Sequence, residues 1–465
     1  MQKTWATSGG LDLHIEVAGS RVRDGLESAL RSAVRTGRLP AGTALPSSRA
    51  LARDLGIARN TVVDAYGQLV AEGWLAARHG SGTWVAERTA PPAATPEVRP
   101  LADGRAIRHD LRPGVPDVSA FPRTAWLAAA RRALAAAPAT DFGYADPRGL
   151  PPLRAALAGY LARARGVAVT PERIVVCSGY AEALTLLSQV LRARGATDLA
   201  VESFGLRVHQ HIAATTGLGL RTLEVDRHGA VTSALTSEAA VLLTPAHQFP
   251  LGVVLHPRRR REVVDWAADT GGVVIEDDYD GELRYDRQAV GALQSLAPER
   301  VAYAGTASKS LVPGLRLGWL VLPDWLVDDV AAAKRAAMRL SSSLDQLTLA
   351  DFITSGGYDR QVRRTRLGYR QRRDRLVSEL KRRAPRAHVT GIAAGLHALV
   401  TLPPGASEHA VVTAAARRGL AVQGLADFSH GGQDHEAALV VGYANPPAHA
   451  FTSALARLCA VLGEV

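Results

Sequence analysis

Residues 301–318 read VAYAGTASKSLVPGLRLG, an apolar stretch that leads directly to a lysine, Lys309. The small hydroxyl residues Thr306 and Ser308 precede this lysine, and Arg316 follows it seven residues later. A lysine amine can form a Schiff base with an aldehyde cofactor. Two hydroxyls and the two-pronged donor of an arginine can together bind a phosphate. Taken alone, this segment also fits an ordinary surface lysine after a strand.

A second apolar segment, 271–275, runs into the acidic sequence Glu276-Asp-Asp-Tyr-Asp280. Pyridoxal 5'-phosphate (PLP) needs a carboxylate at its pyridine nitrogen, and Asp277 can supply one. Tyr279 can donate a hydrogen bond to the ring hydroxyl. Alternate residues of a strand share a face, so we expect Asp277 and Tyr279 to point the same way. A solvated acidic loop or a divalent-metal site also fits this run, but neither explains the lysine segment.

A third segment carries the sequence Cys177-Ser-Gly-Tyr180 between the strand-like RIVVC and the helical AEALTLLSQVL. The N-terminus of a helix beside a glycine is a ready site for an anion. Ser178, Gly179 and Tyr180 are therefore candidates for binding a phosphate, although a Ser-Gly pair at such a turn is common. The three segments together describe one cofactor, PLP, held by an amine, a carboxylate and a phosphate cradle.

The organisation of the chain predicts more than one domain, because 465 residues exceed a single hydrophobic core. From about residue 109 to 465, short apolar strands alternate with helical stretches. This alternation predicts an α/β fold with a mostly parallel sheet covered on both faces. Residues 87–108 are rich in proline and alanine and predict a linker. The clearest strands are RIVVC, DLAVE, AAVLLTP, GGVVIED, VAYAGT and LGWLVLP.

The segment before the linker, 11–86, predicts a helix-turn-helix followed by a β wing. Ser47 and Ser48 offer N-cap oxygens to a helix over 48–55, and Gly56 suits a left-handed C-cap. A second helix is expected from about Ala58 to Glu72, which completes a helix-turn-helix unit. Residues 74–85 then suggest two strands around a glycine-rich tip. An ordinary three-helix packing module is the competing interpretation of the helices alone.

The second helix of this module begins with Arg59, Asn60 and Thr61, the positions that face base edges in a helix-turn-helix. Arg78 supplies positive charge in the wing. The full string LPSSRALARDLGIARNTVVDAYGQLVAEGWLAARHGSGTWV resembles the winged helix of the GntR family. That resemblance implies DNA contacts from Arg49, Arg59, Asn60, Thr61, Gly80 and Gly82.

Residues 110–465 resemble the fold-type I aminotransferases, through the three PLP segments and through the stretches Tyr144-Ala-Asp-Pro-Arg-Gly149 and 245–252. The resemblance implies an additional C-terminal small domain. It also implies that Tyr144 reaches the phosphate of a neighbouring subunit and that His247 or Gln248 lies over the ring hydroxyl. A GntR-type head on such a domain looks like the MocR/GabR family of transcription regulators. Membership implies a head-to-tail homodimer that binds double-stranded DNA, PLP and a small-molecule effector.

Two positions depart from the family pattern. Leu206 occupies the place of a tyrosine that often stacks on the cofactor ring. Asp427 occupies the place of an arginine that binds the carboxylate of an amino-acid effector in GABA-sensing members. Asp427 therefore argues against such an amino acid and is compatible with a PdxR-like sensor of PLP itself, which regulates vitamin B6 synthesis. An amine or amino-acid effector remains the alternative.

Two function classes stay open, a regulator that uses PLP as a sensor and an aminotransferase with an accessory DNA-binding head. The fused winged helix favours the regulator, so we expect no enzymatic role. The net charge of +11 agrees with a nucleic-acid partner. An arginine-rich stretch, 360–375, is either a second DNA-tracking surface or, as we expect, a solvated helix face. Neither a metal-ligand spacing nor a signal or membrane segment is apparent, so we expect no metal and a cytoplasmic protein.

Overall fold

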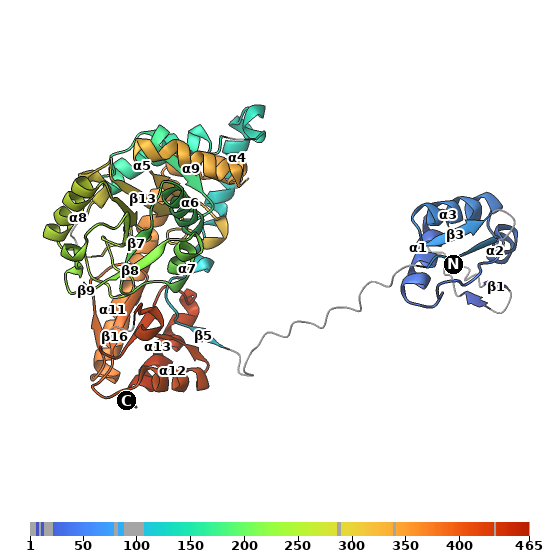
Figure 1. Ribbon diagram of the computed structural model, residues 1–465. Coiled ribbons are helices and arrows are strands. Elements are labelled where there is room, and N and C mark those ends of the chain that lie inside the picture. Colours follow the sequence, from blue (N-terminus) through green and yellow to red (C-terminus); the bar gives the residue numbers. More distant parts are fainter. Residues whose placement is uncertain are drawn as a thin grey trace. The chain divides into compact units, whose positions relative to one another are not determined.

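The computed structural model describes residues 6–8, 11–13, 22–78, 82–87, 107–144, 146–285, 290–337, 341–431 and 434–464. The chain divides into two compact units, Met1–Ala102 and Asp103–Val465, and Figure 1 shows the helices and strands of each. Most of the predicted linker lies outside the described residues. The domain boundaries at 11–86, 87–108 and 109–465 therefore remain predictions.

The first unit contains the predicted helix-turn-helix and wing. Helix α2 is capped by Ser47, whose Oγ accepts a hydrogen bond from the amide of Ala50, and it ends at Gly56 with φ +67°. The predicted bounds and caps of this helix are confirmed, and α3 begins one residue later than predicted. The elements are β1 (Ala6–Ser8), β2 (Leu11–Leu13), α1 (Val22–Arg35), α2 (Ser48–Leu55), α3 (Arg59–Ala71) and the antiparallel pair β3 (Leu75–Arg78) and β4 (Gly82–Val85).

A seven-stranded sheet in the order β6-β14-β13-β12-β11-β7-β8 organises the second unit. All its pairs are parallel except those of β14, which runs antiparallel to both neighbours. The sheet confirms the predicted, mostly parallel α/β fold, and six of its strands are the six predicted ones. The strands are β6 (Ile174–Cys177), β7 (Asp198–Glu202), β8 (Gly219–Leu223), β11 (Ala240–Leu243), β12 (Val273–Asp277), β13 (Val301–Thr306) and β14 (Gly318–Val321).

Helices cover both faces of this sheet, because alternate strand residues point to opposite sides. On one face Val175 and Ala304 pack with α6 and α9. On the other, Val176 and Trp319 pack with α5 and α10, and Val274 packs with α8. These helices and their neighbours are α4 (Arg123–Ala136), α5 (Pro151–Arg165), α6 (Tyr180–Ala193), α7 (Arg207–Thr215), α8 (Pro257–Thr270), α9 (Asp324–Ala336) and α10 (Ser343–Thr354).

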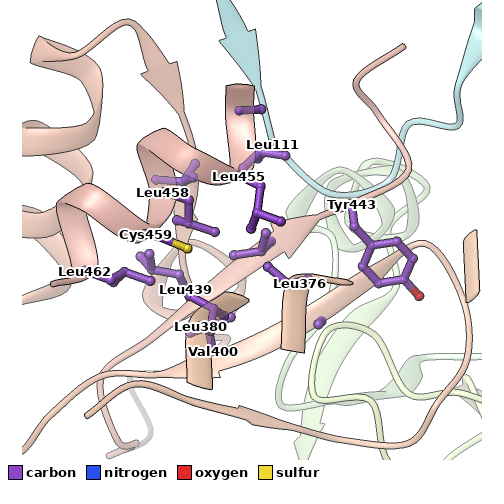
Figure 2. Packing of buried hydrophobic residues seen from close by; sticks show 14 of the residues in the cluster. Leu111, Leu376, Leu380, Val400, Leu439, Tyr443, Leu455, Leu458, Cys459 and Leu462 are labelled. Atoms are coloured by element: carbon purple, nitrogen blue, oxygen red, sulfur yellow. The ribbon is translucent and has the colours of Figure 1, made fainter. Parts of the chain in front are cut away.

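A smaller antiparallel sheet, β15-β16-β19-β18, forms the C-terminal part of the unit. Figure 2 shows how Leu376 and Leu380 of α11 meet Leu455 and Leu458 of α13 beside Leu439, a buried cluster that holds the sheet to its helices. The elements are α11 (Gly357–Arg383), β15 (His388–Thr390), β16 (His397–Thr401), α12 (Glu408–Arg417), β17 (Leu420–Ala421), β18 (Gln423–Gly424), β19 (Ala438–Gly442) and α13 (Ala448–Leu462), and β17 also pairs with β5 (His109–Asp110). Among the helices of the described ranges, none is both long and apolar enough to cross a membrane.

Candidate functional site

A cavity of about 260 Å³ lies at the ends of several strands of the large sheet. Parallel strands present their carboxyl ends at one edge, where ligands of open α/β sheets bind. β12 ends in Asp277, β13 ends in Thr306 just before Lys309, and Gly179 follows β6. The three predicted segments, which are spread over residues 177–318 of the chain, therefore meet at one place. The predicted residues that line the cavity are Gly179, Tyr180, Asp277, Tyr279, Thr306, Ser308, Lys309 and Arg316.

The amine of Lys309 is largely enclosed, and its Nζ donates a hydrogen bond of 2.6 Å to the carbonyl of Gly114. Burial lowers the pKa of Lys309 below its usual range, while the negative charge of Asp277 acts in the opposite direction. A lowered pKa increases the fraction of neutral amine at a given pH, and the neutral amine is the nucleophilic form.

Asp277 is buried, and its Oδ1 has no hydrogen-bond partner among the described residues. Burial raises the pKa of this carboxyl well above its usual range, and the positive charge of Lys309 opposes the shift. A buried acceptor left without a donor is costly, so this atom is suited to a ligand N–H. Strand β12 stops at Asp277, but Tyr279 still reaches the cavity, and its hydroxyl lies 3.1 Å from Nδ1 of His247.

A cradle for an anion forms where α6 begins. Gly179 is the N-cap of this helix with φ +99°, and a Cβ built there would stand 3.4 Å from Nη1 of Arg316. Arg316 itself has φ +52°, and its guanidinium lies at the cradle. The hydroxyls of Thr306 and Ser308 lie 2.9 Å apart on the same cavity wall. The helix N-terminus, the guanidinium and the hydroxyls together fit a phosphate.

Four predicted site residues do not line this cavity. The amide of Gln248 donates to the carbonyls of Phe204 and Phe249, and His247 lies 2.8 Å from the carboxylate of Asp280. Ser178 turns its Oγ to within 3.5 Å of Ser341, and Tyr144 is 97% exposed. Gln248 and His247 therefore support the cavity wall from behind, and the expected contact of Tyr144 with a second subunit remains a prediction.

The cavity also contains residues that the sequence did not single out. His209, on α7, packs its ring 4.6 Å from that of Tyr180, and burial lowers the pKa of His209 to about 4. His397 and His430 also line the cavity. Burial lowers the pKa of His397 to about 3 and that of His430 to about 4. Isolated histidines carry no spacing signal, so only the fold could identify them.

The two positions that depart from the family pattern have different locations. Leu206 lines the cavity, as expected for the ring-stacking position, whereas Asp427 is exposed and is absent from the cavity lining. Glu202, another unpredicted lining residue, accepts hydrogen bonds from the amide and hydroxyl of Thr244, and burial raises its pKa to about 7.

The predicted DNA-contacting residues that can be placed lie on one small unit. Arg59 and Asn60 are exposed at the first turn of α3, Thr61 follows them half-buried, and Arg49 is exposed near the start of α2. Arg78 and Gly82 are exposed at the two ends of the wing strands. Gly80 lies outside the described residues. The side chains are therefore available to a partner in the manner of a helix-turn-helix.

Two families match this chain, "Bacterial regulatory proteins, gntR family" over residues 23–85 and "Aminotransferase class I and II" over residues 112–446. The HTH-type pyridoxine biosynthesis transcriptional regulator PdxR of Corynebacterium glutamicum is 34% identical over 90% of this chain and 91% of that protein. The probable rhizopine catabolism regulatory protein MocR of Rhizobium meliloti is 34% identical over 77% of this chain and 76% of that protein.

Solved structures resemble the larger unit. An archaeal alanine:glyoxylate aminotransferase superposes with a TM-score of 0.70 at 24% sequence identity, covering 78% of this chain and 92% of that one. This likeness confirms the predicted fold-type I aminotransferase architecture.

Proposed function

Because this chain belongs to the transcription regulators that join a GntR-family DNA-binding domain to an aminotransferase class I and II domain, we propose that it binds PLP at Lys309 and uses the bound cofactor to control DNA binding. The observation that carries the proposal is the unpaired Oδ1 of Asp277 in the same cavity as the enclosed amine of Lys309. An acceptor without a donor and a nucleophile of lowered pKa are the two groups that the pyridine nitrogen and aldehyde of PLP require.

Each part of the cavity has a role toward this cofactor. PLP supplies an aldehyde and an electron-withdrawing ring. Lys309 provides the amine, Asp277 accepts the N–H of the ring, and Tyr279 is within the cavity to bind the ring hydroxyl. Gly179, Thr306, Ser308 and Arg316 hold the phosphate. Tyr180 and His209, whose rings pack together in the cavity lining, would exclude water from the bound cofactor.

The effector that we propose is PLP itself, and the proposed target is vitamin B6 synthesis. The relative named for pyridoxine biosynthesis matches nearly the whole chain and supports this assignment. An amine or amino acid that displaces Lys309 from the cofactor is the alternative. We also propose a head-to-tail homodimer, since Tyr144 is exposed and free to enter a second copy's phosphate site. A regulator that reads DNA acts in the compartment that holds it, so the cytoplasmic location belongs to the same proposal.

A working aminotransferase is the second candidate, because the cavity retains a lysine, a carboxylate and a phosphate cradle on an aminotransferase fold. An assay with common amino-acid donors and oxo-acid acceptors separates the two. If the protein is a sensor, we expect no sustained turnover of the amino-acid donors. Many turnovers per minute would support the enzyme instead.

The direct test of the cofactor site uses borohydride reduction of the purified, full-length protein with PLP. The sequence has only four lysines, Lys3, Lys309, Lys334 and Lys381, so mass spectrometry can assign the attached lysine unambiguously. We expect the label on Lys309, its loss in Lys309→Ala, and its retention in the surface control Lys381→Ala. Labelling of Lys309→Ala at the wild-type level would contradict the proposal.

The proposed control of DNA binding by PLP is tested by measuring the affinity of the protein for DNA. Fluorescence anisotropy with duplex DNA from beside the chain's own gene, titrated with and without PLP, should give two different affinities. Lys309→Ala should give one affinity under both conditions. Equal wild-type affinities with and without PLP would contradict the sensor role, because a ligand shifts an equilibrium only through differential binding.

A further inference from the structure

A second groove, away from the Lys309 cavity, lies between α5, the segment 281–284 and the first half of α11, and has a volume of about 650 Å³. Six arginines line it, and we call it the arginine groove. The acidic residues on its walls are Glu282 and Asp359. The lining arginines are Arg163, Arg165, Arg284, Arg360, Arg363 and Arg366.

Some arginines of the groove already form ion pairs or hydrogen bonds within the protein, and others do not. Arg165 is buried against Asp278 at 2.7 Å, and Arg163 pairs with Asp359 at 3.0 Å. Arg360 donates to the carbonyl of Ser355. Arg363 and Arg366 are exposed on α11, and no carboxylate within the described ranges forms an ion pair with either. Two guanidinium groups in this groove are therefore available to an external anion.

These two arginines belong to a longer row. Arg363, Arg366, Arg370 and Arg373 follow one another at spacings of three, four and three residues, which places them along one face of α11. Ten residues of helix rise about 15 Å, which is longer than a single phosphate group. A row of this length suits an extended polyanion better than a small anion.

The charge of α11 is too one-sided for an ordinary solvated helix. Its sequence, GYDRQVRRTRLGYRQRRDRLVSELKRR, holds eleven basic residues and three acidic ones. Charged helices in solvent usually balance such residues through pairs three or four positions apart. Here Arg370 has a distant partner, Asp374 at 3.8 Å, and the remaining acidic residue of the later turns, Glu379, contacts Arg382 and Arg383.

We propose that the arginine groove and the row that continues it on α11 bind the sugar–phosphate backbone of duplex DNA. The proposal rests on the proposed DNA-binding function and adds a second contact surface, on the aminotransferase-like unit. Arginine binds phosphate with two parallel hydrogen bonds, and backbone contacts fix the position of a protein on a duplex without reading its sequence. The proposal replaces the solvated helix face that we expected from the sequence, because the helix borders a groove and Arg363 and Arg366 form no ion pair within the described residues.

Glu282, on the wall of the groove, is compatible with an anionic occupant. Its carboxylate accepts hydrogen bonds from the hydroxyls of Tyr160 at 2.7 Å and Tyr358 at 3.2 Å. Burial raises the pKa of Glu282 to about 7, so near neutral pH a substantial fraction of this carboxyl is uncharged and repels a phosphate less.

The test measures how the affinity of the full-length protein for a random-sequence duplex depends on salt. The groove variant carries Arg363→Gln, Arg366→Gln and Arg370→Gln. The matched control carries Arg131→Gln, Arg258→Gln and Arg335→Gln, which removes the same charge from exposed positions on other helices. Each lost phosphate contact lowers the slope of log K against log salt by about 0.9, so we expect the groove variant to lose about 2 to 3 and the control to keep the wild-type slope.

A third variant guards against loss of structure. Arg363→Lys, Arg366→Lys and Arg370→Lys keeps the charges and should restore most of the slope, since lysine still binds phosphate as a point charge. If wild-type protein binds DNA but the groove and control variants have equal slopes, the proposed role of the arginine groove is contradicted and the proposed function is not. If wild-type protein does not bind duplex DNA at low salt, the proposed function itself is contradicted. A groove variant that binds DNA like the control but loses inorganic phosphate in calorimetry would identify a small-anion site and also overturn the proposal.

Discussion

Gly179 and Arg316 face each other so closely that a Cβ on Gly179 would stand 3.4 Å from Nη1 of the guanidinium. The backbone of Gly179 also adopts φ +99°, a region that other L-residues rarely occupy. The absence of a side chain is therefore what leaves room for an anion between the start of α6 and the arginine.

Gly179→Ala should weaken PLP binding about tenfold, because the methyl group enters the cradle, and backbone strain should also lower the stability of the folded protein by on the order of 1–3 kcal/mol. A spectrophotometric titration with PLP measures the affinity. Gly314→Ala is the matched control, since a Cβ there meets nothing within 4 Å. Unchanged affinity in Gly179→Ala would place the phosphate elsewhere.

Asp277→Asn should lower PLP affinity by about tenfold or more, because a charged hydrogen bond contributes on the order of 1.5–3 kcal/mol and the amide lacks the charge. The loss is read from equilibrium dialysis. Asp280→Asn removes a neighbouring charge that is absent from the cavity lining, so it should change the affinity much less. Equal losses in both variants would show that only the general negative charge matters.

Glu202→Gln tests the raised pKa of a cavity carboxyl by its effect on stability against pH. The folded-state pKa is about 7 and the ordinary value is 4.5. Between these pH values the carboxyl of Glu202 is protonated in the folded protein and ionised in the unfolded protein. The contribution of Glu202 to stability is thus full below about pH 4.5 and is lost as pH rises through about 7.

All three hydrogen bonds to this carboxylate end on Oε2, so glutamine can keep them with its amide oxygen. The Tm of wild type minus that of Glu202→Gln should therefore fall from about pH 5 to about pH 7 and level off above that pH. A constant difference across this range would contradict the assigned pKa.

Arg59→Ala should weaken binding to a specific duplex by about 1–3 kcal/mol and relax the preference for one base pair, since arginine at this helix position reads a base edge. Thermal stability should not change, because the side chain is exposed. Arg35→Ala, at the last turn of α1, is the control and should retain the specificity. Footprinting together with anisotropy measures both effects.

The sequence predicted those parts of the fold and site that depend on local chemistry. Apolar runs identified six strands of the large sheet, and Ser47 with Gly56 identified both ends of α2. Lys309 and Asp277 were found because Asp277 ends one strand and Lys309 lies three residues after the end of another, and parallel strands end at a common edge.

Residues whose role depends on distant partners escaped prediction or were misplaced. His247 or Gln248 was expected over the ring hydroxyl, and the amide group of Gln248 is bonded to the backbone of Phe204, 44 residues away in sequence. His209 and His397 reach the cavity from separate elements, and no spacing pattern connects a histidine of α7 with one of β16. The arginine row was visible in the sequence, but the groove beside it needed the packing of α5 against the segment around Glu282.

The buried side chains of the first unit form a cluster of their own, made entirely of residues from Leu26 to Val85. A calorimetric scan of this protein should therefore show two endotherms, the smaller from the head and the larger from the remaining chain. Ligands that occupy the Lys309 cavity should move the larger endotherm to higher temperature and leave the smaller one in place. The melting temperature of each unit would then report separately on the ligands that bind to it.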